Sequence, residues 1–215
     1  MDMVTATQPN LIPEAFREIV LQRPLDADDL RSFPDDRNRY EIIGGQLIVS
    51  PSPSTRHQQI LLELATSLKL YLLAERRGQV FVAPLDVRLS FYDVVQPDLL
   101  VVLNDRADII QERGILGAPN LVVEILSPSS QVNDRVDKAA LYARSGVQEY
   151  WIVDPDTETV TVYGLDGDRF SPAASLKRSL DLYSVALEGF VLDLDIIFPD
   201  APAESSVEIP VETDE

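Results

Sequence analysis

Two acidic residues stand inside otherwise apolar segments, and they constrain how this chain can fold. Asp98 lies within residues 94–103 (VVQPDLLVVL), and Glu124 lies within residues 121–126 (LVVEIL). Such runs of Val, Ile and Leu are typical of strands that are covered on both faces of a sheet. An ionised carboxylate in this position is costly unless it is paired or bound to a metal. The two runs therefore predict a central sheet that holds two acids at a cation site.

The composition is that of an ordinary globular protein. The chain has 215 residues, of which 45% are hydrophobic and 25% are charged, and this length suffices for one domain with a full core. It contains no Cys, which excludes disulfides, thiolate zinc sites and cysteine nucleophiles. No apolar run approaches the roughly 18 residues that span a bilayer, and residues 1–10 do not resemble a secretory signal. We therefore expect a cytoplasmic protein with no membrane partner.

The charge of the chain restricts how it could bind nucleic acid. The formal net charge is -18, which is the wrong sign for binding by bulk electrostatics. Part of this charge lies in residues 199–215, where six acids face no Lys or Arg. Together with Pro, Ala and Ser, these acids predict a disordered tail. Any binding of DNA must therefore depend on a local site.

Apolar periodicity and turn residues predict a mixed α/β (α+β) fold. Helices are expected over about residues 11–22, 56–76 and 132–144, with a shorter helix beginning near residue 27. Strands are expected over residues 40–43, 46–49, 80–89, 94–103, 121–126, 150–153 and 159–163, with two weaker strands within 182–194. These elements predict a single domain over residues 1–198, with a helical extension over about 11–33 and a tail over 199–215.

Strand alternation allows the directions of the two acids to be compared. Asp98 shares a strand face with Leu100, and Glu124 shares one with Val122. If the two strands are neighbours, both carboxylates converge on one face of the sheet. Mg²⁺ takes oxygen ligands, usually one or two carboxylates with waters and substrate phosphate, and the Ile125 carbonyl could add another. Such a cation polarises a phosphoryl oxygen and activates a water, so the pattern points to phosphodiester chemistry.

Five segments carry a resemblance to a known family. They are YEIIGGQLIVSPSPSTRHQQI, APLDVRLS, VVQPDLLVV, APNLVVEILSPSS and DRVDKAALYARSGVQEYWIVDP, which together cover roughly residues 40–155. With them the chain resembles the Uma-type family of restriction-endonuclease-like proteins, within the PD-(D/E)XK nuclease superfamily. The resemblance implies a restriction-endonuclease-like core with a central mixed sheet flanked by helices. It also implies that Asp98 and Glu124 bind Mg²⁺, for which Mn²⁺ can substitute, and that Glu41 is an additional upstream acid.

One position departs from the superfamily pattern. Leu126 stands two residues after Glu124, where the superfamily has a lysine. The resemblance implies that Lys138, from the following helix, takes its place and orients the attacking water or neutralises phosphate charge. Lys138 belongs to a helix stripe with Asp134, Leu141 and Tyr142, opposite a stripe of Val and Ala. It reaches the site only if its own stripe faces the sheet; otherwise it is a solvated lysine paired with Asp134.

Three further residues are candidates for substrate contacts: His57, Gln58 and Arg135. His57 is the single histidine, which excludes three-histidine zinc sites and the His-Glu-x-x-His motif. The interpretation that competes with substrate contact, and that we favour, is that His57 caps or lines the start of its helix. The chain also lacks a Gly-x-Ser-x-Gly elbow, a G-x-G-x-x-G motif and a P-loop, which argues against serine hydrolases and nucleotide-cofactor enzymes.

The sequence is compatible with three functions. The leading hypothesis is a Mg²⁺-dependent endonuclease that cleaves DNA, and a homodimer is expected because two sites most simply cleave both strands of a duplex. The second is a catalytically inactive restriction-endonuclease-like fold that serves as a DNA-binding or assembly module, which the acidic charge motivates. The third is a carboxylate-pair hydrolase acting on sugars, for which the chain offers little beyond two acids.

Overall fold

The computed structural model describes residues 23–36, 38–127 and 132–198, except for the side chains of residues 132–135. The helix expected over 11–22 and the tail expected over 199–215 lie outside these residues. Within the expected N-terminal extension, the described part contains a single 3-10 turn, η2 (Asp29–Ser32).

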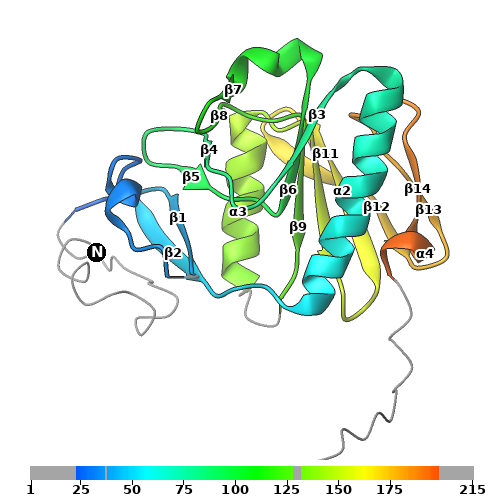
Figure 1. The fold of residues 1–215 in the computed structure, drawn as a ribbon, viewed down its shortest axis with the longest axis horizontal. Coiled ribbons are helices and arrows are strands. Elements are labelled where there is room, and N and C mark those ends of the chain that lie inside the picture. Colours follow the sequence, from blue (N-terminus) through cyan, green and yellow to red (C-terminus); the bar gives the residue numbers. More distant parts are fainter. Residues whose placement is uncertain (1–22, 37, 128–131, 199–215) are drawn as a thin grey trace, which may run out of the picture.

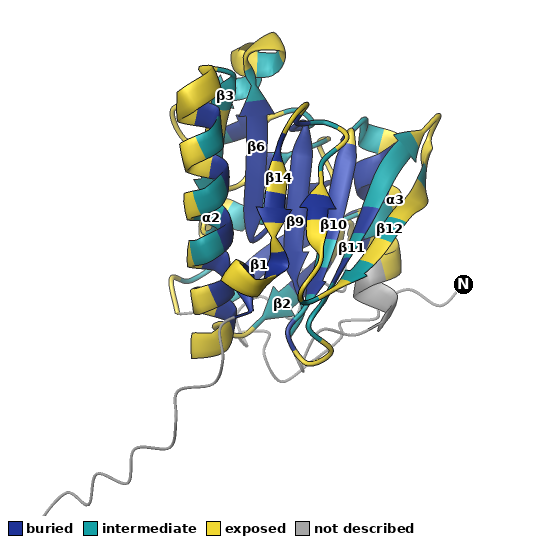
Figure 2. Ribbon diagram, turned by 90° about the vertical axis from the view of Figure 1, so that its right-hand side faces the viewer, coloured by how far each residue is buried: buried dark blue, intermediate teal, exposed yellow. Residues whose placement is uncertain are grey.

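The main sheet has six strands in the order β12-β11-β10-β9-β6-β3. Its strands are β3 (Gly78–Val82), β6 (Leu99–Leu103), β9 (Leu121–Ile125), β10 (Glu149–Asp154), β11 (Thr159–Asp166) and β12 (Arg169–Lys177). β9 runs parallel to β10 and antiparallel to β6, so the sheet is mixed. Every residue of β9 is buried, and Figure 2 shows this strand among the buried central strands. The apolar run around Glu124 is thus explained by cover on both faces.

Two long helices cover the main sheet, one on each face (Figure 1). α2 (Thr55–Glu75) begins where the Ser54 hydroxyl accepts a hydrogen bond from the His57 backbone amide; this is a standard N-cap. Its leucines pack with Leu99, Val101 and Val123. α3 (Val132–Ser145) packs with the alternate residues of the same strands, including Leu100 and Val122. Strand alternation therefore divides the core between the two helices.

A second sheet lies beside the main one, in the order β2-β1-β5-β4-β8-β7. Its strands are β1 (Arg39–Ile43), β2 (Gln46–Ser50), β4 (Val87–Arg88), β5 (Val94–Val95), β7 (Ile110–Gln111) and β8 (Gly114–Leu116), and the 3-10 helix η3 (Asn104–Ile109) precedes β7. β1 and β2 form the expected hairpin, with both glycines of its turn at positive φ. β13 (Asp181–Tyr183) and β14 (Val191–Asp193) form a separate pair, followed by α4 (Leu194–Ile197).

The mixed α/β fold with a central sheet flanked by helices is confirmed, but two expected strands are wrong in detail. Residues 80–89 form β3 and β4, which belong to different sheets, and residues 94–103 form β5 and β6, which are also in different sheets. Pro84 and Pro97 lie in the two interruptions. Proline has no backbone N–H to donate to a ladder, so it ends strand pairing. As a result, Asp98 lies directly before β6 and not within a continuous strand.

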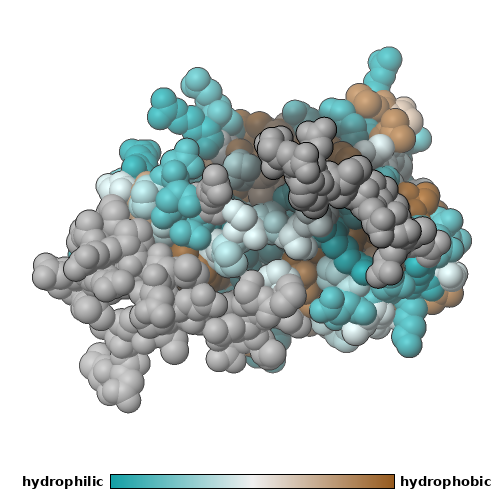
Figure 3. All heavy atoms as spheres, turned by 60° about the horizontal axis from the view of Figure 1, so that its bottom comes forward, coloured by the Kyte–Doolittle hydropathy of each residue, from teal (hydrophilic) through white to brown (hydrophobic). Residues whose placement is uncertain are grey.

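The surface combines polar residues with scattered apolar ones. Hydrophilic residues cover much of the described surface on the face shown in Figure 3, with hydrophobic residues between them. Of the helices in the described part of the chain, none has the length and apolar character that crossing a membrane requires.

Candidate active site

Asp98 and Glu124 lie opposite each other where β6 begins and β9 ends. The antiparallel register pairs Leu99 with Val123, so the next pair outward is Asp98 with Glu124. Residues that oppose each other in an antiparallel pair project from the same face. The relative exposure of Asp98 is 2% and that of Glu124 is 9%. The strands that carry Asp98 and Glu124 are therefore neighbours, as the convergence of the two acids requires.

Asp98 is held by three donors from three different elements. Arg39 Nη2 donates to its Oδ1 at 2.9 Å, and the Ile125 backbone N–H donates to its Oδ2 at 2.8 Å. His57 Nε2 lies 3.1 Å from the same Oδ2. Burial raises the pKa of Asp98, but the hydrogen bond from His57 and the charge of Arg39 outweigh burial and lower this pKa to about 2. Asp98 is therefore ionised at neutral pH.

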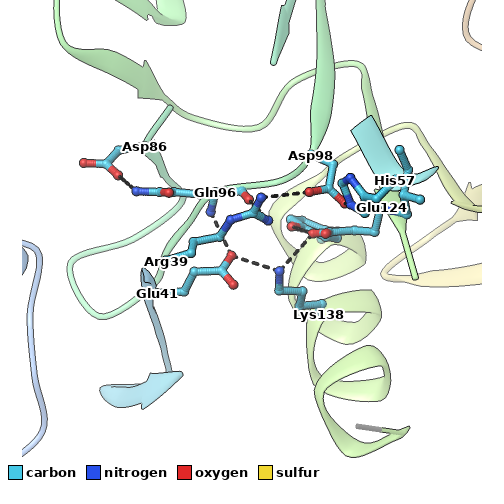
Figure 4. A network of polar contacts seen from close by, with 10 residues as sticks. Arg39, Glu41, His57, Asp86, Gln96, Asp98, Glu124 and Lys138 are labelled. Atoms are coloured by element: carbon cyan, nitrogen blue, oxygen red, sulfur yellow. Dashed lines mark hydrogen bonds and ion pairs between the residues drawn. The ribbon is translucent and has the colours of Figure 1, made fainter. Parts of the chain in front are cut away.

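Glu124 shares a cation with a second buried acid. Lys138 Nζ lies 3.0 Å from Glu124 Oε1 and 2.9 Å from Glu41 Oε1. The Tyr142 hydroxyl donates to Glu124 Oε1 at 2.7 Å, and the Gln96 backbone N–H donates to Glu41 Oε1 at 2.8 Å. Figure 4 shows Lys138 between the two glutamates. The cluster thus joins β1, β9, α3 and the loop before β6.

Burial and the neighbouring charges together shift the pKa values of both Glu124 and Lys138 upward. Burial raises the pKa of Glu124, and the neighbouring charges of Asp98 and Glu41 raise it further against the opposing effect of Lys138. Burial lowers the pKa of Lys138, but the two glutamates outweigh burial, and the net shift is upward. Lys138 therefore keeps its proton and acts as a cation and hydrogen-bond donor.

The orientation of α3, which the sequence left open, is decided by burial. Lys138, Leu141 and Tyr142 are all buried, whereas Val136 on the other stripe is 62% exposed. The stripe that carries Lys138 therefore faces the sheet, and the alternative of a solvated lysine is wrong. The side chain of Asp134, its proposed partner in that alternative, lies outside the described residues.

The structure brings together most, but not all, of the predicted site residues. Glu41, Asp98, Glu124, Lys138 and His57 all belong to one cluster, and Ile125 joins it through its backbone N–H. Gln58 is exposed on α2, and no polar contact among the described residues links its side chain to the cluster. The side chain of Arg135 lies outside the described residues.

Sequence reasoning missed two members of the cluster, Arg39 and Tyr142. Arg39 lies two residues before Glu41 on β1, so strand alternation places both on one face. This spacing could have predicted that Arg39 belongs to the same site as Glu41. Tyr142 lies one helical turn after Lys138, a spacing that puts both on one helix face.

The donor set fits one class of metal better than others. Among the described residues, no group of three or more His, Cys, Asp or Glu is arranged to hold a metal ion. Mg²⁺ keeps several waters and binds through one or two carboxylates, so the two acids Asp98 and Glu124 could hold it without a third side chain. In this cluster three acidic side chains, Glu41, Asp98 and Glu124, contact two basic ones, Arg39 and Lys138.

Comparison with known proteins shows the family to which this chain belongs. A model of the Uma2 family, described as "Putative restriction endonuclease", matches residues 27–195. The chain belongs to the Uma2 family. Two Synechocystis proteins, named "Uncharacterized protein slr1290" and "Uncharacterized protein sll1609", are each 27% identical to it, over 164 and 147 residues. These matches cover 74% and 66% of this chain and 83% and 81% of the relatives.

A solved structure supports the same fold. It is described as a "putative nuclease belonging to DUF820" from Anabaena variabilis, and it matches with a TM-score of 0.67 at 22% sequence identity. The match covers 81% of this chain and 98% of that one. The resemblance to the Uma-type family and the restriction-endonuclease-like fold are thus both confirmed.

Proposed function

We propose that this Uma2 protein is a Mg²⁺-dependent endonuclease that hydrolyses phosphodiester bonds in DNA. The observation that carries the proposal is the position of the Lys138 ammonium, 3.0 Å from Glu124 Oε1, where Glu124 lies opposite Asp98. Two acids and one lysine at the end of a central sheet are the chemical groups that such hydrolysis needs. The family description and the description of the Anabaena variabilis structure as a "putative nuclease" support the same reaction class.

Asp98 and Glu124 would hold the metal, with the Ile125 carbonyl as a candidate third protein ligand. When bound, Mg²⁺ supplies a Lewis acid that polarises a phosphoryl oxygen and lowers the pKa of a bound water. Arg39 and His57 fix the Asp98 carboxylate from both of its oxygens. This leaves Asp98 little freedom to turn, which pre-organises it as a ligand.

Lys138 would act as a charged donor and not as a general base, because its pKa is raised. Its ammonium has three N–H groups, and Glu41 and Glu124 accept two of them. The third N–H would donate to the attacking water or to a phosphoryl oxygen, where negative charge develops in the transition state. Glu41 would hold Lys138 in this position.

The experiment combines cleavage with metal binding. Single-stranded DNA, duplex DNA and RNA are incubated with Mg²⁺ or Mn²⁺ and the wild type, Asp98→Asn or Glu124→Gln. We expect both variants to lose at least about 100-fold in rate and to lose a Mn²⁺ site measured by calorimetry. Glu112→Gln, an exposed position in the turn before β8, makes the same chemical change outside the cluster and should leave both unchanged.

A folded wild type with no Mn²⁺ site and no cleavage of any substrate would overturn the proposal. That result would favour a non-catalytic DNA-binding or assembly module, which the net charge of -18 also motivates.

A further inference from the structure

Arg39 places a positive charge directly on one of the two proposed metal ligands. Its Nη2 donates to Asp98 Oδ1 and its Nη1 donates to the Gln96 carbonyl, each at 2.9 Å. Figure 4 shows the guanidinium beside Asp98. The Arg39 side chain is 19% exposed, so water screens only part of its charge, and a guanidinium keeps its proton in proteins. Asp98 therefore has a permanent cation beside it.

The other carboxylate oxygen of Asp98 has two contacts of its own. Oδ2 accepts a hydrogen bond from the Ile125 backbone N–H at 2.8 Å and lies 3.1 Å from His57 Nε2. A carboxylate offers about four lone-pair sites, shared equally between its oxygens, so these contacts use both sites of Oδ2. A metal that binds Asp98 is therefore directed to Oδ1, which is the atom that Arg39 contacts.

A divalent cation on Oδ1 meets the charge of Arg39 at short range. Mg²⁺ binds carboxylate oxygens at about 2.0–2.1 Å, and Arg39 Nη2 is 2.9 Å from Oδ1, so the ion and this nitrogen would be no more than about 5 Å apart. Like charges at this separation repel strongly where little water intervenes. The charge of Arg39 also reaches the second acid: burial raises the pKa of Glu124, whereas the charges of Lys138 and Arg39 act to lower it. Arg39 therefore opposes an added cation at each of the two acids.

We propose that Arg39 competes with the metal for Asp98 and thereby sets how tightly the metal binds. This inference rests on the proposed function, because it takes Asp98 and Glu124 as the metal ligands. When a metal binds, the Arg39 guanidinium leaves Oδ1, while His57 and the Ile125 N–H keep the carboxylate in place through Oδ2. Arg39 thus differs from His57, which orients the carboxylate both with and without the metal.

The affinity for Mn²⁺, measured by calorimetry on the full chain, tests this competition. We expect Arg39→Met to bind Mn²⁺ at least about tenfold more tightly than the wild type, a difference of about 1.4 kcal/mol, because the competing charge is gone. A residue that only braced Asp98 would give the opposite sign, a loss of affinity. Arg39→Lys keeps a positive charge and should stay close to the wild type. Arg23→Met is the matched control: Arg23 pairs with Asp29 at 2.6 Å outside the cluster, and its replacement should leave the affinity unchanged.

A second measurement uses the unaltered chain, so it does not depend on whether Arg39→Met folds. The side-chain N–H signals of isotope-labelled arginine are followed by NMR as Mg²⁺ is added to the wild type. The signals of Arg39 are assigned by their absence from Arg39→Lys. We expect these signals to shift and to exchange faster with water once the contact with Asp98 is lost, while those of Arg23 stay in place.

The outcomes separate this inference from the proposed function. Equal or weaker Mn²⁺ binding by a folded Arg39→Met, or Arg39 signals that saturating Mg²⁺ leaves unchanged, would overturn the competition and leave the metal site in place. A Mn²⁺ site that only Arg39→Met shows would support the competition and count against metal-dependent cleavage by the wild type. The absence of a Mn²⁺ site from both proteins would overturn both ideas. Circular dichroism shows whether Arg39→Met is folded.

Discussion

Lys138 and Glu124 lie on different elements, and the lysine Nζ is 3.0 Å from the glutamate Oε1. Glu124 is near the end of β9, and Lys138 approaches it from α3, which packs over the same face of the sheet. Leu126, at the position where the superfamily has its lysine, instead lines an apolar pocket between α3 and the β11–β12 hairpin. The ammonium beside Glu124 thus comes from a helix, and Leu126 on the strand side packs in an apolar pocket.

Replacing Lys138 tests both its catalytic and its structural role. In Lys138→Met, Glu41 and Glu124 lose their shared cation, so we expect a loss of about 3–5 kcal/mol in the free energy of unfolding. We expect cleavage to fall by about 10²–10⁴, measured under single-turnover conditions. The double variant Lys138→Met/Glu124→Gln removes one uncompensated charge and should regain part of the stability but none of the activity. A Lys138→Met protein as stable as the wild type would contradict this.

Replacing Tyr142 tests how the protonation of Glu124 is controlled. The hydroxyl donates to Glu124 Oε1 at 2.7 Å, and this bond favours the ionised carboxylate. In Tyr142→Phe the pKa of Glu124, already raised by burial, should rise further. Metal binding needs the ionised form of Glu124. The pH below which Mn²⁺ affinity falls, which is the acid limb of the pH profile, should therefore move to a higher value. Tyr183→Phe, on a 65% exposed residue, should leave the limb in place, and an unmoved limb in Tyr142→Phe would refute the role.

The central fold could be predicted from the sequence because burial on both faces leaves a local signature. Leu121–Ile125 is apolar throughout apart from Glu124, and every residue of it is buried. β12 was missed because it is a half-exposed strand at the edge of the sheet with Pro172 in its middle, so no apolar alternation marks it. The interruptions within residues 80–89 and 94–103 were missed for another reason. Proline at positions 84 and 97 prevents hydrogen bonds to partner strands, and these partners are distant in sequence.

The site could be predicted in part, for a similar reason. Strand alternation shows that Asp98 and Glu124 can converge if their strands are neighbours, and the pairing of β6 with β9 meets that condition. The orientation of α3 could not be derived, because both of its stripes carry apolar side chains and only packing shows that Val136 is exposed. The pairing of Arg39 with Asp98 spans 59 residues and depends on how the β1–β2 hairpin lies against the main sheet.

Two leucines of α2 provide a matched test of the packing. Leu68 is fully buried against the main sheet, whereas Leu62 on the same helix is 64% exposed. Leu68→Ala leaves a cavity and should lower the free energy of unfolding by about 2–5 kcal/mol. Leu62→Ala makes the same change in helix propensity and should stay within about 0.5 kcal/mol of the wild type. Urea denaturation measures both, and equal losses would show that α2 does not pack as described.

Asp98 should stabilise the metal-free protein at neutral pH, and this stabilisation should be lost in acid. Its pKa falls from the ordinary value of 3.8 to about 2 on folding. A carboxyl whose pKa is lower in the folded state stabilises the fold fully above about pH 3.8, and this contribution disappears as the pH falls toward about 2. The lowering corresponds to on the order of 2 kcal/mol. Glu124 acts in the opposite direction because its pKa is raised, so the contribution of Asp98 must be isolated by comparison.

Asp98→Asn provides that comparison, because it removes the titrating group and keeps the shape of the side chain. The free energy of unfolding of both proteins is measured by urea denaturation from pH 6 to pH 2 in the presence of a chelator. We expect the wild type to lose stability relative to Asp98→Asn below about pH 4, so that the difference between them shrinks by on the order of 2 kcal/mol. A difference that stays constant across this range would mean that the contacts with Arg39 and His57 do not lower the pKa of Asp98.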